Sequence, residues 1–156
     1  MGRGRRPVVR MKRSFPPIAD LVPHAGPMVL LDEVLAWEEP RIVCGTRIQP
    51  GMIFAEGDVA PATVALEYMA QTAATYAGLL AKMTGDVVRN GYLLGTRELI
   101  LHIDQFAVGD DLTIEAERVW GDEFLGSFRC TVTRDAKTVA SAVLSVYQGA
   151  LPEEIR

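Results

Sequence analysis

Residues 61–83 read PATVALEYMAQTAATYAGLLAKM, and this stretch decides the fold. Alanine and glycine crowd it, and Pro61 stands at the start, where a helix loses no hydrogen bond to a proline. Glu67 is the only charged residue from Pro61 to Ala81. The pattern predicts one long helix over 61–83. Because small side chains lie all around it, we expect burial on more than one side, as when a curved sheet wraps around a helix.

One face of this helix carries polar side chains at four-residue steps: Thr63, Glu67, Gln71 and Thr75. The stripe has two interpretations, a face turned to solvent or the lining of a cleft or a subunit contact. Solvent-facing stripes usually carry several lysines and glutamates, whereas this one has a single carboxylate. Its composition therefore favours the cleft or the subunit contact.

The segments on both sides of the helix predict β-structure. Before it, residues 28–37 (MVLLDEVLAW) and 41–48 (RIVCGTRI) form a predicted hairpin around a Glu-Glu-Pro turn, and residues 51–60 are irregular. After it, turn signals at 121–122 and 134–137 separate strands with period-two alternation. The strands expected there are 92–106, 111–120, 123–134 and 138–148. One helix against an antiparallel sheet is an α+β fold.

Composition excludes several classes of protein. The chain has 156 residues and 17.0 kDa, with 49% apolar and 23% charged residues, which fits one folded domain rather than a disordered or fibrous chain. No apolar run has the roughly 18 residues of a membrane span, and no secretion signal follows the start. Cys44 and Cys130 have neither metal-ligand spacing nor the number needed for a disulfide framework. We therefore expect a cytoplasmic protein without a metal site.

The charge is distributed unevenly. Residues 1–13 carry six basic side chains and no acidic one, and since the whole chain has a net charge of −4, residues 14–156 carry −10. A basic arm can contact nucleic acid, but no aromatic side chains lie between these charges and the rest of the chain is acidic. We expect a disordered, solvated tail over 1–13, or a protein that starts at Met11, followed by one domain over 14–156. Nucleic acid is not an expected partner.

Three separated motifs then resemble one family. Residues 21–34 (LVPHAGPMVLLDEV), 66–71 (LEYMAQ) and 106–112 (FAVGDDL) are similar, in this order, to motifs of the hot-dog-fold β-hydroxyacyl-acyl-carrier-protein dehydratases. The VPHAGPM and EYMAQT variants most resemble the ApeP-like dehydratases of aryl-polyene clusters. The resemblance covers about residues 16–149. It implies a hot-dog fold, in which an antiparallel sheet wraps around a long central helix.

The chain departs from the family at one catalytic position. The fatty-acid-type enzymes have a histidine in a G-H-F-P-G loop, fourteen residues before the helix glutamate. Here the loop reads GMIFA, so that Ile53 stands at the histidine position and Phe54 at the family phenylalanine. Isoleucine cannot transfer a proton. The resemblance therefore carries over Glu67 as a catalytic residue but not the family histidine.

Dehydration requires a base for the α-proton, an acid for the leaving hydroxyl and donors for the thioester oxygen. The chain has two histidines, and we expect His24 in its Pro-His-Ala-Gly-Pro loop, rather than His102, to be the replacement base beside Glu67. Gln71 is expected to bind substrate, or to hold Glu67 or a catalytic water. The remaining residues expected to bind substrate are Ile53, Phe54 and the helix start at Pro61, Ala62 and Thr63.

The resulting hypothesis is a 3-hydroxyacyl-acyl-carrier-protein dehydratase that needs no cofactor. The expected partners are an acyl carrier protein with its phosphopantetheine-bound acyl chain and a second hot-dog subunit, in a homodimer or a hetero-oligomer. Because carrier domains are acidic, basic side chains are expected to dock them: Lys82, Arg89, Arg97 and the segment 10–13. Two alternatives remain open, a non-catalytic partner subunit of an active dehydratase and an acyl thioesterase.

Overall fold

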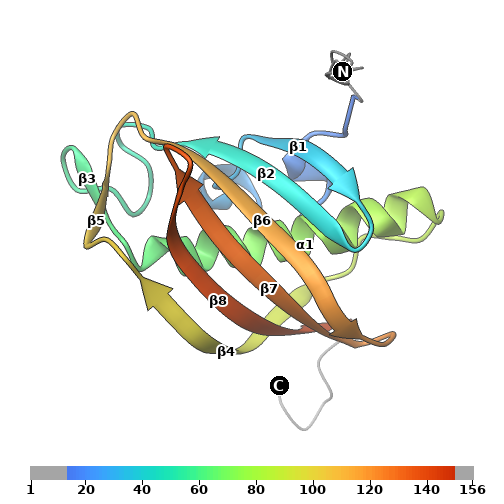
Figure 1. Cartoon of the computed structure of the whole chain (residues 1–156). Coiled ribbons are helices and arrows are strands. Elements are labelled where there is room, and N and C mark those ends of the chain that lie inside the picture. The colour runs from blue at the N-terminus through green and yellow to red at the C-terminus, as the bar shows by residue number, and fades with distance from the viewer. Residues whose placement is uncertain (1–13, 150–156) are drawn as a thin grey trace, which may run out of the picture.

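The computed structural model describes residues 14–149, so the predicted tail over 1–13 lies outside the described residues. Figure 1 shows one long helix against a curved sheet. The helical elements are η1 (Ile18–Asp20), η2 (Gly26–Met28) and α1 (Val64–Met83). The strands are β1 (Glu33–Glu38), β2 (Arg41–Arg47), β3 (Val59–Pro61), β4 (Gly91–Leu101), β5 (Gln105–Ala107), β6 (Asp111–Gly121), β7 (Leu125–Arg134) and β8 (Lys137–Gln148). None of the helices in this part of the chain is both long and apolar enough to cross a membrane.

The main sheet is antiparallel, in the order β1-β2-β6-β7-β8-β4, and β3 pairs with β5 in a small separate sheet. Helix α1 packs against β2, β6, β7 and β8 from one side. The predicted α+β fold is confirmed. The hairpin turns expected at 121–122 and 134–137 are also confirmed, since β6 pairs with β7 and β7 with β8 around them.

The inner face of the sheet follows the predicted alternation. Leu112, Ile114 and Ala116 of β6 are buried, whereas Thr113 between them is exposed. Phe128, Cys130 and Val132 of β7 are buried in the same way. These side chains form the core with the buried face of α1, which positions the helix across the sheet.

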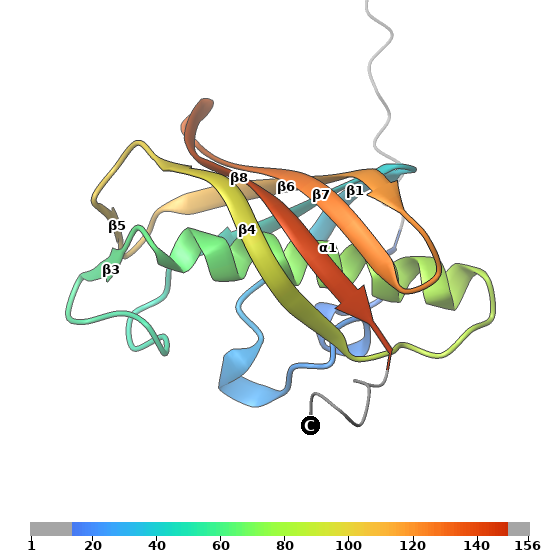
Figure 2. The ribbon, with the colours of Figure 1, turned by 90° about the horizontal axis from the view of Figure 1, so that it is seen from below.

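Helix α1 is covered on two sides, as its small residues predict. Figure 2 shows the sheet on one side of α1 and the N-terminal segment on the other. A Cβ atom at Gly78 would collide with the carbonyl oxygen of Leu21, so only glycine permits this close approach. The segment that comes closest to the helix backbone at Gly78 is thus this N-terminal one, not the sheet.

Both ends of α1 have local causes. The predicted start at Pro61 is wrong by three residues because Pro61 pairs with Gln105 in the β3–β5 sheet. At the other end, Gly85 adopts a φ of 73°, and the next amide, Asp86 N–H, donates to the carbonyl oxygen of Ala81. Glycine adopts this left-handed backbone readily, so it ends the helix.

The strand predicted over 28–37 begins only at Glu33. The cause is a pair of side-chain hydrogen bonds at Leu30. Its amide donates to Oε1 of Gln71 (2.9 Å), and its carbonyl oxygen accepts from Oγ1 of Thr46 (2.7 Å). The amide and carbonyl groups of Leu30, which in a strand would bond to a neighbouring strand, are therefore bonded to side chains instead.

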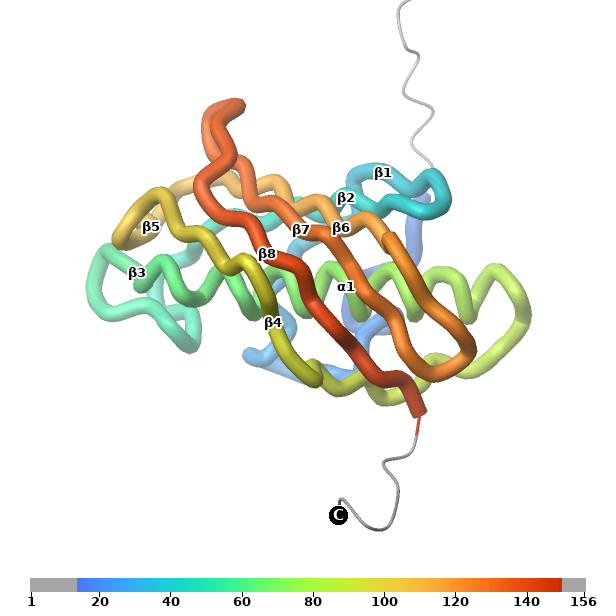
Figure 3. The backbone as a smooth tube through the Cα atoms, turned by 60° about the horizontal axis from the view of Figure 1, so that its bottom comes forward, coloured from blue at the N-terminus to red at the C-terminus, as the bar shows by residue number. Residues whose placement is uncertain are grey.

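The strand predicted over 92–106 is divided into β4 and β5, because Phe106 and its neighbours pair with β3 instead of continuing along β8. Strand β4 lies at the edge of the sheet, with β8 on one side and, within residues 14–149, no strand on the other (Figure 3). Leu93, Leu94 and Ile100 of this strand are exposed. An edge strand with exposed apolar side chains is a surface that another chain can pair with.

Candidate active site

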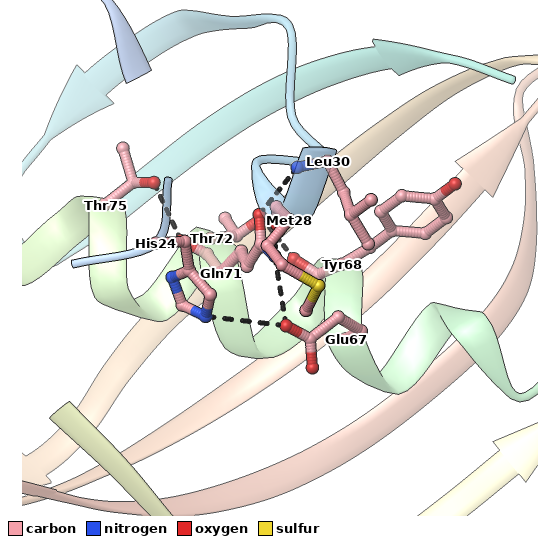
Figure 4. A network of polar contacts seen from close by, with 8 residues as sticks. All are labelled: His24, Met28, Leu30, Glu67, Tyr68, Gln71, Thr72 and Thr75. Atoms are coloured by element: carbon pink, nitrogen blue, oxygen red, sulfur yellow. Dashed lines mark hydrogen bonds and ion pairs between the residues drawn. The ribbon is translucent and has the colours of Figure 1, made fainter. Parts of the chain in front are cut away.

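His24 and Glu67 lie side by side (Figure 4). His24 is in the loop between η1 and η2, and Glu67 is in the first turn of α1. The Nε2 atom of His24 is 3.6 Å from Oε1 of Glu67, and the two side chains are 29% and 33% exposed. A partly buried imidazole and a carboxyl at this separation form a pair that a single substrate can contact with both groups.

Gln71 lies behind this pair and is completely buried. Its Nε2 donates to Oε1 of Glu67 (3.0 Å) and to the carbonyl oxygen of Met28 (2.7 Å), and its Oε1 accepts from the amide of Leu30. The amide of one side chain thus joins the helix that carries Glu67 to the segment that follows His24.

The imidazole of His24 reaches the carboxylate through one nitrogen. Its other nitrogen, Nδ1, is buried and has no hydrogen-bond partner among residues 14–149. Nε2 is therefore the nitrogen that is available for proton transfer at this site.

A cavity of about 360 Å³ begins at His24 and Glu67. It follows the small side chains of α1, which leave room beside the helix, and its opposite wall comes from the sheet. The helix residues are Ala70, Ala73, Ala74, Ala77 and Ala81, and the wall includes Tyr92, Phe124, Phe128 and Val146. Since fourteen residues separate Glu67 from Ala81, this face of the helix is about 21 Å long. The shape and apolar lining suit an extended hydrocarbon chain.

The turn between β6 and β7 also lines the cavity. Arg118 and Asp122 line it there, and a guanidinium nitrogen of Arg118 donates to the backbone oxygen of Asp122 (2.9 Å). Tyr76, from α1, forms part of the wall, and burial raises the pKa of its hydroxyl. Tyr76 therefore contributes an uncharged side chain to the cavity wall at pH 7.

The remaining residues predicted to bind substrate lie elsewhere. Ile53 and Phe54 are exposed in the loop before β3, and Ile53 is 48% exposed. Pro61, Ala62 and Thr63 precede α1 and do not line the cavity, and the Ala62 amide already donates to the carbonyl oxygen of Asp104 (3.0 Å). The Ala62 amide therefore cannot hold a thioester oxygen as the structure stands. Gln71 is not in the lining either.

His102 does not reach the site. It follows β4, its side chain is exposed, and its amide donates to the carbonyl oxygen of Val139. The two cysteines are buried in the sheet, where burial raises the thiol pKa to about 12 for both Cys44 and Cys130. They are protonated at neutral pH and do not act as nucleophiles. No group of side chains within residues 14–149 has the arrangement of a metal site.

Sequence reasoning missed the wall that the sheet contributes to the cavity. Tyr92, Phe124 and Phe128 are far from Glu67 in the sequence, and no local pattern joins them to it. The alanines of α1 did carry a signal, because Ala70, Ala73, Ala77 and Ala81 recur at helical spacing on the face that carries Glu67.

The resemblance to known proteins extends over most of the chain. The family model of the ApeP dehydratases matches residues 16–155. The chain belongs to the ApeP-like dehydratase family. The family predicted from the motifs is thereby confirmed, and so is the hot-dog fold.

Individual relatives of this ApeP-like protein have low sequence identity to it. It is 26% identical over 144 residues to the 3-hydroxyacyl-[acyl-carrier-protein] dehydratase FabZ of Acinetobacter baylyi, covering 87% of this chain and 95% of that one. A solved structure, the dehydratase heterocomplex ApeI:P from Xenorhabdus doucetiae, matches with a TM-score of 0.84 and 27% identity over 90% of this chain and 96% of that one. A hypothetical thioesterase with coenzyme A from Streptococcus pneumoniae shares the fold, with a TM-score of 0.58 and 14% identity over 78% of this chain and 88% of that one.

Proposed function

We propose that this protein removes water from a 3-hydroxyacyl thioester held on an acyl carrier protein and produces the trans-2-enoyl thioester. The observation that carries the proposal is the His24–Glu67 pair, 3.6 Å apart, at the start of a mainly apolar cavity. Membership of the ApeP-like dehydratase family supports the reaction class.

In this mechanism Nε2 of His24 accepts the proton from C2 of the substrate. The C2–H electron pair forms the C2–C3 double bond, the C3–O bond breaks, and the leaving hydroxyl takes a proton from the carboxyl of Glu67 and departs as water. His24 is then protonated and Glu67 ionised. Return of one proton from His24 to Glu67, across their short separation, restores the starting state.

The proposal assigns to His24 the role that the family histidine has in the loop now occupied by Ile53. That loop is exposed, and Ile53 has no group that can transfer a proton. His24 reaches Glu67 within the same chain.

The acyl carrier protein is proposed to dock through exposed basic side chains, because carrier domains are acidic. Arg89 lines the cavity and forms an ion pair with Asp86 (3.5 Å), and Lys82 lies in the last turn of α1. Arg97 is exposed on β4. Charge reversal at Lys82 and Arg89 should weaken carrier binding and its salt dependence; unchanged binding would exclude this docking site.

A second hot-dog subunit is proposed to pair along β4. No strand of the described part of the chain pairs with its outer edge, and its exposed Leu93, Leu94 and Ile100 are side chains that a partner would cover. A second copy gives a homodimer, and a related subunit gives a heterocomplex such as the one described for ApeI:P. The solution mass should be about twice that of one chain when the protein is alone, and a monomer would argue against pairing between identical copies.

A non-catalytic partner subunit is the second candidate function, because Ile53 stands where the family has its catalytic histidine. One experiment separates the candidates. The purified protein is incubated alone with 3-hydroxyacyl and with enoyl thioesters. Interconversion of the two marks a dehydratase, release of free thiol marks a thioesterase, and absence of both marks a partner subunit.

A further inference from the structure

The connection between α1 and β4, residues 84–90, forms part of the cavity wall. Thr84, Asp86, Val87 and Arg89 line the cavity. None of residues 84–90 belongs to the hydrophobic core or packs against it. Figure 2 shows this connection passing from the end of α1 to the edge strand β4. One wall of the cavity is therefore a loop, whereas the others are a helix and a sheet.

This loop is held together by bonds within itself. Oδ1 of Asp86 accepts from the amide of Val87 (2.8 Å), and Oδ2 of Asp86 is 3.5 Å from a guanidinium nitrogen of Arg89. The next bond to the sheet is made by the carbonyl oxygen of Asn90. Within residues 14–149, no hydrogen bond or ion pair joins the loop between Asp86 and Asn90 to another element. The loop is thus a preformed turn that is attached only at its two ends.

Val87 is the apolar side chain that this turn presents. It is 70% exposed, more than any other large apolar side chain within residues 14–149. Yet it lines the same cavity as Leu80 and Ala81 of α1. Burial of an exposed valine is favourable, and an apolar ligand in the cavity would provide the surface against which Val87 can be buried.

We propose that Val87 is a specificity-determining residue that favours long acyl chains, an inference that rests on the dehydratase activity proposed above. Residues 84–90 act as a strap that is open in this structure and closes over a bound chain. Gly85, with a φ of 73°, and Gly91, at the start of β4, are the hinges at the two ends of the strap. Closure brings Val87 onto the carbons farthest from the thioester.

The length of the cavity determines which chains reach the strap. Ala77 and Ala81 line the cavity ten and fourteen residues after Glu67, about 15 and 21 Å along the helix. An extended chain gains about 1.2 Å per bond, since three bonds of a backbone span about 3.3–3.6 Å. The fifteen bonds beyond C3 of an eighteen-carbon chain therefore extend about 18 Å, between these two alanines. A four-carbon chain ends beside the catalytic pair.

This difference in reach leads to a difference in binding. Closing the strap costs conformational entropy, because the turn exchanges many arrangements for one. A long chain offsets that cost, since the chain and Val87 cover each other's apolar surface. A four-carbon chain provides no such surface, so the strap stays open around it.

The first test is steady-state kinetics with eighteen-carbon and four-carbon 3-hydroxyacyl thioesters. The ratio of kcat/KM for the longer to the shorter substrate should fall about 3- to 10-fold in Val87→Ser and be retained in Val87→Ile. The matched control is Val119→Ser, which changes an exposed valine of β6 that does not line the cavity, and its ratio should equal that of the wild type. A Val87→Ser ratio equal to that of the wild type would overturn the proposal.

The second test measures closure without turnover. Trypsin cleaves after arginine, and the Arg89–Asn90 bond lies in the exposed strap. The probes are eighteen-carbon and four-carbon 3-hydroxyacyl-pantetheine analogues in which nitrogen replaces the thioester sulfur. The longer analogue should slow cleavage of this bond at least about 5-fold in the wild type, and less in Val87→Ser, while the shorter one should not slow it. Cleavage after the exposed Lys137, in the turn before β8, is the internal control and should not change with either analogue.

The two tests distinguish this inference from the proposed function. A wild-type protein that dehydrates both substrates, but whose strap is cleaved equally fast with and without the longer analogue, would overturn the strap alone. Equal protection by both analogues would also overturn it, because closure would then not depend on chain length. A wild-type protein without turnover would overturn the dehydratase activity, and cleavage at Arg89 would still decide whether the strap closes on a long chain.

Discussion

The carbonyl oxygen of Leu21 lies against the Cα atom of Gly78, so the segment that leads into the His24 loop packs directly on the backbone of α1. Gly78 and Glu67 belong to one rigid helix, and Leu21 precedes His24 by three residues. This contact therefore contributes to the placement of His24 beside Glu67.

Gly78→Ala should lower the free energy of unfolding by about 1–3 kcal/mol, because the added methyl group has no room and the backbone must shift. The measurement is denaturant unfolding, together with turnover, which should also fall as the His24 loop moves. The control is Gly95→Ala, where a Cβ atom would meet no atom within 4 Å. Equal stability of Gly78→Ala and the wild type would show that the segment at Leu21 moves away at little cost.

Ala77→Leu should shorten the cavity without touching the catalytic pair. Ala77 lines the cavity ten residues after Glu67, about 15 Å along the helix. We expect kcat/KM to fall at least about 10-fold for a long-chain 3-hydroxyacyl thioester and to stay unchanged for a four-carbon one. Kinetics with the two substrates provide the control within one variant. An equal loss with both substrates would mean that the acyl chain does not lie along this face.

Asp122 gives the fold a dependence on pH. Its Oδ1 accepts from the amides of Leu125 (2.7 Å) and Phe124 (2.8 Å), and these hydrogen bonds lower the pKa of the carboxyl. A carboxyl whose pKa is lower in the folded state stabilises that state above its ordinary pKa of about 3.9, and the contribution is lost as the pH falls through the lowered value. Asp122→Ala should therefore be less stable than the wild type at pH 7, with a smaller difference in strong acid.

Unfolding curves of both proteins at several pH values check this. Glu123→Ala, at the exposed neighbouring position, is the control and should follow the wild type. A stability difference for Asp122→Ala that stays constant down to strong acid would show that its carboxylate form does not contribute.

Much of the fold could be predicted because its signals are local. The alternation around Ile114, the turn before Lys137 and the alanine-rich helix depend on neighbouring residues only. The prediction failed where distant side chains decide the backbone. Leu30 is held by Gln71 and Thr46 rather than by a strand, and no pattern near Leu30 reports this.

The same distinction applies to the site. Glu67 stands out in the sequence because it is isolated on an apolar helix, and His24 because of its motif and the small number of histidines. The structure brings these two together. It does not bring Ile53, Phe54 or the helix start to the cavity. The role of Ile53 and Phe54 is predicted from the family loop, and that of the helix start from the free N–H groups of a helix N-terminus. Neither signal reports which residues line the cavity.

The central claim is that His24 and Glu67 transfer the protons of one dehydration, and the most direct test is the turnover of His24→Ala, Glu67→Gln and their double variant on a 3-hydroxyacyl thioester. Each single variant should lose about 10²–10⁴-fold in turnover, as expected for general acid–base groups, and the double variant should lose little more than the worse single one. His102→Ala should remain near the wild type. The account is contradicted if His24→Ala keeps more than about a tenth of the wild-type turnover while Glu67→Gln abolishes it, because a carboxylate would then act without the imidazole.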